Sequence, residues 1–200
     1  MVREDAMTDR ILEQLIKLNI IDSENEEIYR FGLEGLSLKL IHYTSYFVIA
    51  FFAQEMTRFL IFFASFLILR KSAGGYHTRT RGSCYISSCI IVFCMVICIK
   101  MIADWHFIEP SGCILLLLSD ICIYGFAPLG NRNREYDTEE ILLFRKRTVS
   151  LLLLENILLV ILQLVGKTNY AIPIVLAIGV EAGLLLIEKI RTMKVNGNGN

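Results

Sequence analysis

The sequence lacks the features of a nucleic-acid, zinc or disulfide-rich protein. Its 200 residues contain 20 basic and 20 acidic side chains, so a net charge of zero gives no reason to expect a nucleic-acid partner. Its six cysteines form no CxxC pair and show no Cys/His spacing typical of a zinc site. Because these cysteines lie in or beside apolar segments, a disulfide framework is not expected either. They are Cys84, Cys89, Cys94, Cys98, Cys113 and Cys122.

The first 21 residues lack the continuous apolar segment and the small-residue cleavage site of a secretory signal, so we expect no cleaved signal. Their apolar residues instead recur at helical spacing opposite charged ones, which predicts an amphipathic helix lying on the membrane. Ser23 and Glu26 have the spacing of a capping box, which predicts a second short helix running toward Gly32 and Gly35. Residues 1–35 then form a cytoplasmic or interfacial unit. A surface helix that serves only as an anchor is the alternative.

Long apolar segments dominate the rest of the chain. The sequence is 54% hydrophobic with a mean hydropathy of +0.54, which indicates a membrane protein. Six stretches are long enough, or nearly so, to cross about 30 Å of hydrocarbon. They are residues 38–53, 56–70, 84–103, 112–128, 148–165 and 171–188. We therefore predict an all-α, polytopic protein with a six-helix transmembrane domain over residues 36–190 and a disordered tail over residues 191–200.

Basic residues alternate along the chain in a way that predicts the orientation of these spans, because short loops rich in Lys and Arg resist translocation. The loop after the second span, the loop after the fourth span and the C-terminal segment are basic, whereas the intervening loops hold at most one or two basic residues. The basic positions are Arg70, Lys71, Arg79, Arg81, Arg132, Arg134, Arg145, Lys146, Arg147, Lys189, Arg191 and Lys194. Both termini and both basic loops are predicted to be cytoplasmic.

The loop between the second and third spans carries residues suited to chemistry. Residues 70–84 read RKSAGGYHTRTRGSC and combine three glycines with one histidine and one cysteine. A cysteine thiolate is a competent nucleophile, and a nearby imidazole can generate it and later protonate a leaving amine. His77 and Cys84 are therefore the candidate catalytic pair. The alternative is a basic turn in which both residues are incidental.

Spacing alone does not bring the two side chains together. Residues seven apart in a straight helix lie about 10.5 Å apart along its axis, so the chain between His77 and Cys84 must fold back. Gly74, Gly75 and Gly82 supply the conformational freedom for this. Cys84 is then expected to begin the third span. There the helix dipole and free N–H groups would lower the pKa of the thiol, and Arg79 and Arg81 would act in the same direction. The N–H groups of residues 82–84 could also stabilise an oxyanion.

The remaining cysteines and histidines have no comparable surroundings. Cys89, Cys94 and Cys98 lie within the apolar third span, where cysteine usually packs as a small side chain. His42 and His106 stay unassigned.

At this point the sequence resembles the AgrB (accessory gene regulator protein B) family of quorum-sensing peptidases of Gram-positive bacteria. The resemblance depends on Arg70, on Ala73-Gly74-Gly75-Tyr76-His77 and on Cys84 seven residues later. It is supported by the segment Tyr29-Arg30-Phe31-Gly32-Leu33-Glu34, by Ala127-Pro128 before a basic loop, and by six spans in 200 residues.

The resemblance implies a defined reaction in the bacterial cell membrane. Family members cut a small AgrD-like precursor peptide: the cysteine attacks the scissile carbonyl, the histidine acts as base and acid, and an acyl-enzyme thioester remains. A cysteine or serine of the peptide then attacks the thioester and closes a thiolactone or lactone ring. His77 and Cys84 would take these roles, whereas Arg70, Gly74 and Gly75 belong to the motif without an equally defined task. The resemblance also implies that no cofactor or metal is needed, that the protein forms a homodimer, and that it contacts membrane lipid.

Three acidic residues, Asp120, Glu155 and Glu181, lie within apolar spans at a similar depth from the predicted cytoplasmic side. Ionisable groups at such positions usually face a cavity or a partner. They could line a water-filled vestibule in which one of them orients His77 or binds peptide. Alternatively, they pair with cations or hydroxyls and serve helix packing.

Two other functions are compatible with parts of the sequence. A non-enzymatic peptide transporter could use the three intramembrane carboxylates, but the chain shows no internal repeat and no matching pair of Gly/Pro-broken spans. A thiol redox protein is disfavoured because CxxC is missing.

Overall fold

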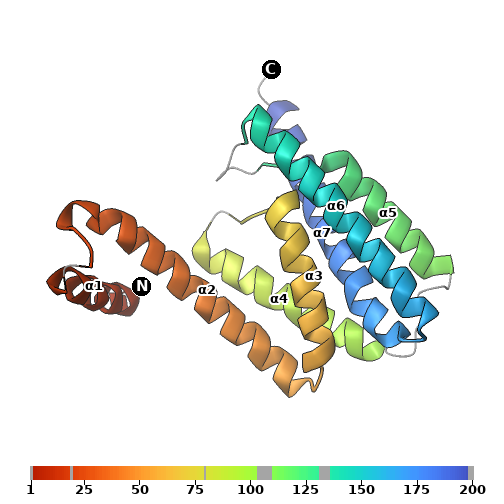
Figure 1. The fold of residues 1–200 in the computed structure, drawn as a ribbon, viewed down its shortest axis with the longest axis horizontal. Coiled ribbons are helices and arrows are strands. Elements are labelled where there is room, and N and C mark those ends of the chain that lie inside the picture. The colour runs from red at the N-terminus through yellow and green to blue at the C-terminus, as the bar shows by residue number, and fades with distance from the viewer. Residues whose placement is uncertain (1, 19, 79, 103–109, 131–135, 198–200) are drawn as a thin grey trace. The chain divides into compact units, whose positions relative to one another are not determined.

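The described residues of this computed structural model are 2–18, 20–78, 80–102, 110–130 and 136–197 (Figure 1). Within these ranges the regular structure is helical, which confirms the all-α class. The elements are α1 (Val2–Lys17), a 3-10 turn η1 (Ser23–Asn25), α2 (Glu26–Phe52), α3 (Met56–Ala73), α4 (Arg81–Met101), α5 (Pro110–Phe126), α6 (Thr138–Leu164) and α7 (Thr168–Gly197).

The chain divides into two compact units, Met1–Val48 and Ile49–Asn200. In the first unit the predicted amphipathic helix forms as α1, with Leu12 buried. Arg30 of α2 joins Asp9 of α1 in an ion pair and also pairs with Glu26 at 2.8 Å. The predicted short helix after Ser23 and the first predicted span are one continuous helix, α2, because no proline or left-handed residue interrupts its backbone.

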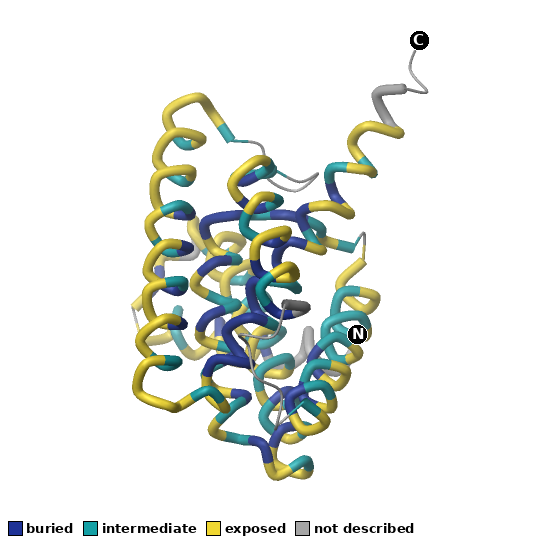
Figure 2. The backbone as a smooth tube through the Cα atoms, turned by 90° about the vertical axis from the view of Figure 1, so that its right-hand side faces the viewer, coloured by how far each residue is buried: buried dark blue, intermediate teal, exposed yellow. Residues whose placement is uncertain are grey.

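The second unit is a helical bundle built around α7. This helix packs against α3, α5 and α6, and its buried apolar residues, such as Ile174, Ile178 and Leu185, form one core with side chains of those three helices. In Figure 2 the buried backbone gathers inside the bundle, while the outward faces of the helices are exposed. Those faces carry many large apolar side chains, an arrangement suited to lipid rather than to water.

Among the described residues, four helices are long and apolar enough to cross a membrane, namely α2, α4, α6 and the Thr168–Lys194 part of α7. Helices also occupy the other two predicted spans. However, α3 has 18 residues that include Arg58, Arg70 and Lys71, and the apolar part of α5 is limited to Gly112–Phe126. The helices are therefore where we predicted spans, but length and composition support four of the six.

Two helix ends differ from our predictions. Helix α6 begins at Thr138 rather than near residue 148, because the Asp137 carboxylate accepts a hydrogen bond of 2.8 Å from the Glu140 N–H and caps the helix. The apolar pattern that we used to place this span does not include its polar first turns. Helix α7 continues to Gly197, so residues 191–197 of the predicted disordered tail are helical.

Polar side chains link the helices inside the bundle. The Ser65 hydroxyl of α3 donates to the Glu155 carboxylate of α6 at 2.7 Å, and both side chains are buried. Asn156 of α6 interacts with Asp120 of α5, although its amide nitrogen donates to the Leu152 carbonyl of its own helix at 2.9 Å. One oxygen of each carboxylate, Asp120 Oδ1 and Glu155 Oε2, is buried without a hydrogen-bond partner among the described residues.

Replacing Ser65 by alanine should destabilise the bundle, because one oxygen of the buried Glu155 carboxylate then loses its hydrogen-bond partner. We expect the free energy of unfolding to fall by about 0.5–2 kcal/mol. Unfolding of the purified protein in mixed detergent micelles would measure the change. Ser45→Ala is the matched control, because the Ser45 hydroxyl donates to the Ile41 carbonyl one turn earlier on its own helix. Equal losses in the two variants would contradict a stabilising α3–α6 link.

Candidate active site

The segment between α3 and α4, residues 74–80, is called the strap here. It is not helical where the structure describes it, so the break that His77 and Cys84 require is present. The strap begins with Gly74 and Gly75, whose φ angles of +77° and +104° disfavour other residues. It then pairs with the α5–α6 connection: the Gly75 N–H donates to the Leu129 carbonyl at 3.1 Å, and the Leu129 N–H donates to the Ala73 carbonyl at 2.9 Å.

Close packing leaves no room for a side chain at either strap glycine. A Cβ atom on Gly74 would lie 2.3 Å from the Leu129 carbonyl oxygen, and one on Gly75 would lie 2.6 Å from Nη1 of Arg70. Both distances are far below normal carbon contacts. The first also involves a backbone atom that is itself held by a hydrogen bond. The glycines of the family motif are therefore required by close packing as well as by conformation.

Arg70 lies in the last turn of α3 and organises the strap. Its guanidinium donates to the carbonyls of Gly74 and Tyr76 and forms an ion pair of 3.6 Å with Glu181 of α7. Glu181 is fully buried, and apart from this ion pair neither of its oxygens has a hydrogen-bond partner among the described residues. The ion pair therefore links the strap to the buried core of the bundle and fixes the position of Arg70.

The strap also lies against the last part of α7. The Tyr76 N–H donates to the Leu184 carbonyl at 3.2 Å, and the Arg191 guanidinium donates to the His77 carbonyl at 3.4 Å. The same guanidinium lies over the Tyr76 ring, 5.7 Å from its centroid. The sequence alone marks Arg191 only as one of the basic residues that predict the topology, and it predicts no role for Leu129.

His77 presents an exposed side chain from this fixed backbone. The protein around the imidazole partly desolvates it, and the Arg70 charge acts in the same direction, so the pKa of His77 lies below its ordinary value of 6.5. Near neutral pH the imidazole is therefore mostly uncharged. This is the form that can accept a proton.

Cys84 lies in the first turn of α4, but it does not begin that helix as we predicted. The helix starts at Arg81 because the Thr80 hydroxyl caps it by accepting from the Ser83 N–H at 3.2 Å, while the Cys84 N–H donates to the Thr80 carbonyl at 3.0 Å. The N–H groups of Ser83 and Cys84 are thus occupied, which leaves Gly82 of the three oxyanion donors that we predicted.

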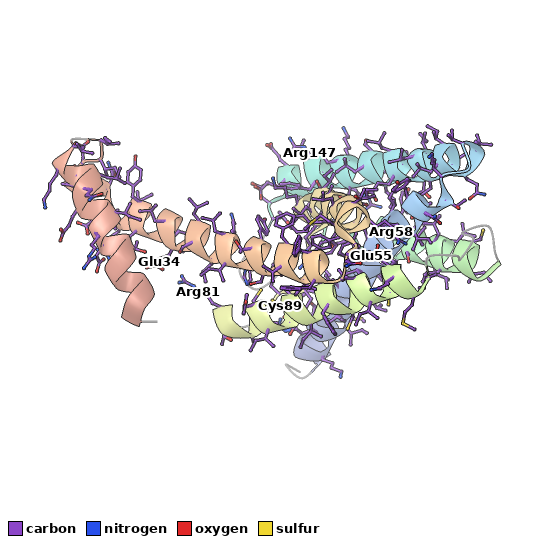
Figure 3. The ribbon with its side chains drawn as sticks, turned by 90° about the horizontal axis from the view of Figure 1, so that it is seen from below. Glu34, Glu55, Arg58, Arg81, Cys89 and Arg147 are labelled. Atoms are coloured by element: carbon purple, nitrogen blue, oxygen red, sulfur yellow. The ribbon has the colours of Figure 1, made fainter. Side chains whose placement is uncertain are left out.

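Cys84 is half-buried and forms no disulfide with another described residue. It still lies within the helix turn where the dipole favours an anion, and the exposed Arg81 lies at the same helix end, as Figure 3 shows. Arg79 is outside the described residues. Within the described strap and α4, no hydrogen bond joins the His77 imidazole to the Cys84 thiol.

The other predicted residues are placed differently with respect to the strap. Of the three intramembrane carboxylates, Glu181 contacts it through Arg70, whereas Asp120 and Glu155 make their contacts between α5, α6 and α3. His42 lies on α2, and His106 is outside the described residues. Over the described ranges, no group of three or more His, Cys, Asp and Glu side chains could hold a metal ion.

Comparison with known proteins identifies the family. The model of the family Accessory gene regulator B matches residues 7–186. The chain belongs to the AgrB family. An AgrB-like protein of Clostridium perfringens strain SM101 and AgrB-like protein 2 of Clostridium perfringens strain 13 are each 28% identical to it over 123 residues. Each match covers 60% of this chain and 58% of the relative, and no solved structure matches.

Membership in the AgrB family connects the protein with the accessory gene regulator system, and the apolar helices agree with a membrane protein. The match includes α3, the strap and α4. The resemblance first noted at Arg70, His77 and Cys84 is therefore confirmed at the level of the family.

A test of the strap geometry is to give each of its glycines a methyl group. Gly74→Ala should distort the Leu129 pairing and Gly75→Ala should displace Arg70, so both variants should unfold at a lower temperature than the wild type. The positive φ alone costs about 1–3 kcal/mol. Gly82→Ala is the control, because it lies in α4 with open space around its Cβ position. A wild-type melting temperature in Gly74→Ala would contradict the close packing.

Proposed function

We propose that the protein is a membrane-embedded cysteine endopeptidase that cleaves the C-terminal part of a small AgrD-like precursor peptide and supports its cyclisation for quorum sensing. The observation that carries this proposal is the strap itself. It fixes the backbone of His77 on one side of a helix break and leads directly into the helix turn that carries Cys84. Together with family membership, this arrangement suits acyl transfer by a thiol.

The proposed reaction has two acyl-transfer steps. His77 removes the thiol proton as the Cys84 sulfur attacks the scissile carbonyl carbon, and the α4 N-terminus stabilises the negative charge. When the tetrahedral intermediate collapses, the C–N bond breaks, His77 protonates the leaving amine of the tail, and a thioester to Cys84 remains. A thiol or hydroxyl of the bound peptide then attacks that thioester, which closes the ring and releases the Cys84 thiol.

The two side chains need to come together for this reaction. Catalytic hydrogen bonds are often long or absent without substrate and tighten when it binds. The His77 backbone is held by Arg191 while its side chain is exposed, so the imidazole can rotate about its own bonds when substrate binds.

We further infer that six helices cross the membrane, with the strap and both termini on the cytoplasmic side. Basic side chains are found at the same end of the bundle as the strap. Lys189 lies over the Phe126 ring at the end of α5, and Arg145 lies over the Tyr124 ring. At the other end of α3, about 27 Å away for 18 residues, Arg58 pairs with buried Glu55 at 2.8 Å (Figure 3). This separation is close to the thickness of the hydrocarbon core of a bilayer, about 30 Å, and the exposed apolar faces of the helices can contact lipid. The homodimer remains a prediction from the family.

Purified protein incubated with the AgrD-like precursor should release the C-terminal tail and form a covalent adduct at Cys84, both visible by mass spectrometry. Cys84→Ala should do neither, because the nucleophile is missing. Cys89→Ala is the matched control on the same helix and should retain wild-type cleavage (Figure 3). Tail release by Cys84→Ala would end the peptidase proposal.

The pH dependence should reflect the lowered pKa of His77. Because the neutral imidazole is the base, single-turnover acylation should already be near its plateau at pH 7 and should fall as the pH drops through a value below 6.5. In His77→Ala this acid limb should disappear and the rate should be much lower at every pH, because no imidazole remains to act as the base. The same acid limb in wild type and His77→Ala would exclude His77 as the base.

A further inference from the structure

The backbone groups at the start of the strap are satisfied by partners on three sides. The N–H groups of Gly74, Gly75 and Tyr76 donate to the carbonyls of Arg70, Leu129 and Leu184. The carbonyls of Gly74 and Tyr76 accept from Arg70, and that of His77 accepts from Arg191. Non-helical backbone near a membrane is stable only when such groups are paired. Arg70 thus donates to two of these carbonyls, and Arg191 donates to the carbonyl of His77.

The two arginines are anchored in the same way. Arg70 pairs with Glu181 at 3.6 Å, and Arg191 pairs with Glu188 at 3.5 Å. Glu181 and Glu188 are seven residues apart on α7, which places them on one face of the helix about two turns apart. Both carboxylates are buried, with side-chain exposures of 0% and 6%. A buried carboxylate without its cation is costly, so each glutamate holds its arginine in place.

We propose that Arg191, held by Glu188, is a positioning residue of the active site that fixes the backbone of His77 and thereby aims its imidazole at Cys84. This inference rests on the proposed function. Arg191 touches the His77 carbonyl and the Tyr76 ring, whereas the structure gives it no contact with the imidazole in the described strap. It therefore acts through the position of His77 and not as a catalytic group.

The contacts of Arg191 predict which kinetic constant changes when its side chain is removed. A loosened strap lowers the fraction of time in which the imidazole faces the thiol, and misplacement by about 1 Å costs up to about 100-fold in rate. Peptide binding does not depend on that alignment, so kcat should fall while KM stays nearly constant. Lysine carries the charge but cannot hold Glu188, cover the Tyr76 ring and bond the His77 carbonyl with one planar group, so it restores only part of the rate.

The experiment compares Arg191→Ala, Arg191→Lys and the control Lys194→Ala, which removes an exposed cation from the next turn of α7. Cleavage of the AgrD-like precursor should show kcat lowered about 10- to 100-fold in Arg191→Ala, with KM within about twofold of wild type. Arg191→Lys should lie between these values, and Lys194→Ala should match wild type. Wild-type kcat in Arg191→Ala, or an equal defect in Lys194→Ala, would overturn the proposal.

A second measurement needs no peptide and therefore separates this proposal from the proposed function. Diethyl pyrocarbonate modifies neutral imidazoles, and mass spectrometry can follow the reaction at His77 alone. Release of the strap should speed modification of His77 several-fold in Arg191→Ala, whereas Lys194→Ala should keep the wild-type rate.

If Arg191→Ala does not accumulate, Glu188→Gln is measured instead and should shift both readouts in the same direction. Wild-type rates in both readouts of that variant would overturn the proposal. A wild-type protein that cleaves no precursor would refute the proposed function but leave the modification result interpretable.

Discussion

The structure depends on one partly buried guanidinium. Arg70 ends α3, satisfies two carbonyls of the strap and pairs with Glu181 inside the bundle, so one side chain joins a helix end, a non-helical segment and the central helix. A charge in this position is tolerated because all of these partners surround it. Without the guanidinium, Glu181 would be a fully buried, unpaired carboxylate, and the strap would lose the donor that allows α3 to stop at Ala73.

These contacts of Arg70 explain why small and polar residues interrupt an otherwise apolar chain at the strap. The turn after Ala73 brings the strap so close to Leu129 and to the Arg70 side chain that only glycine fits at two successive positions. Thr80 then ends the strap by capping α4, which places Cys84 in the first turn of that helix. The position of Cys84, the proposed nucleophile, therefore follows from where the helix is capped.

Much of this arrangement could be predicted from the sequence, and the remainder could not, for physical reasons. Apolar runs locate the six long helices, and a His, three glycines and a Cys within one basic loop mark the site. Helix ends such as Thr138 were missed because their side-chain caps lie outside the apolar pattern. The contacts of Leu129 and Arg191 with the strap join residues 54 or more positions apart, and no local spacing signals them. Likewise, nothing in the sequence distinguishes Glu181 from Asp120 and Glu155. Only the packing of α7 against α3 shows which carboxylate supports the strap.

The pairing of the strap also limits how a substrate can be recognised. An extended peptide often binds by adding a strand to free backbone groups. The N–H groups of Gly74, Gly75 and Tyr76 and the carbonyls of Ala73, Gly74, Tyr76 and His77 already have partners within the protein. Strand addition along residues 73–77 would therefore require breaking contacts that hold His77 in place. For the proposed peptidase, a precursor peptide is better accommodated by contacts with the first turn of α4 and the apolar helix faces beside it. On this reasoning specificity comes from side chains and helix surfaces, and the strap serves as the rigid support that holds the histidine in position.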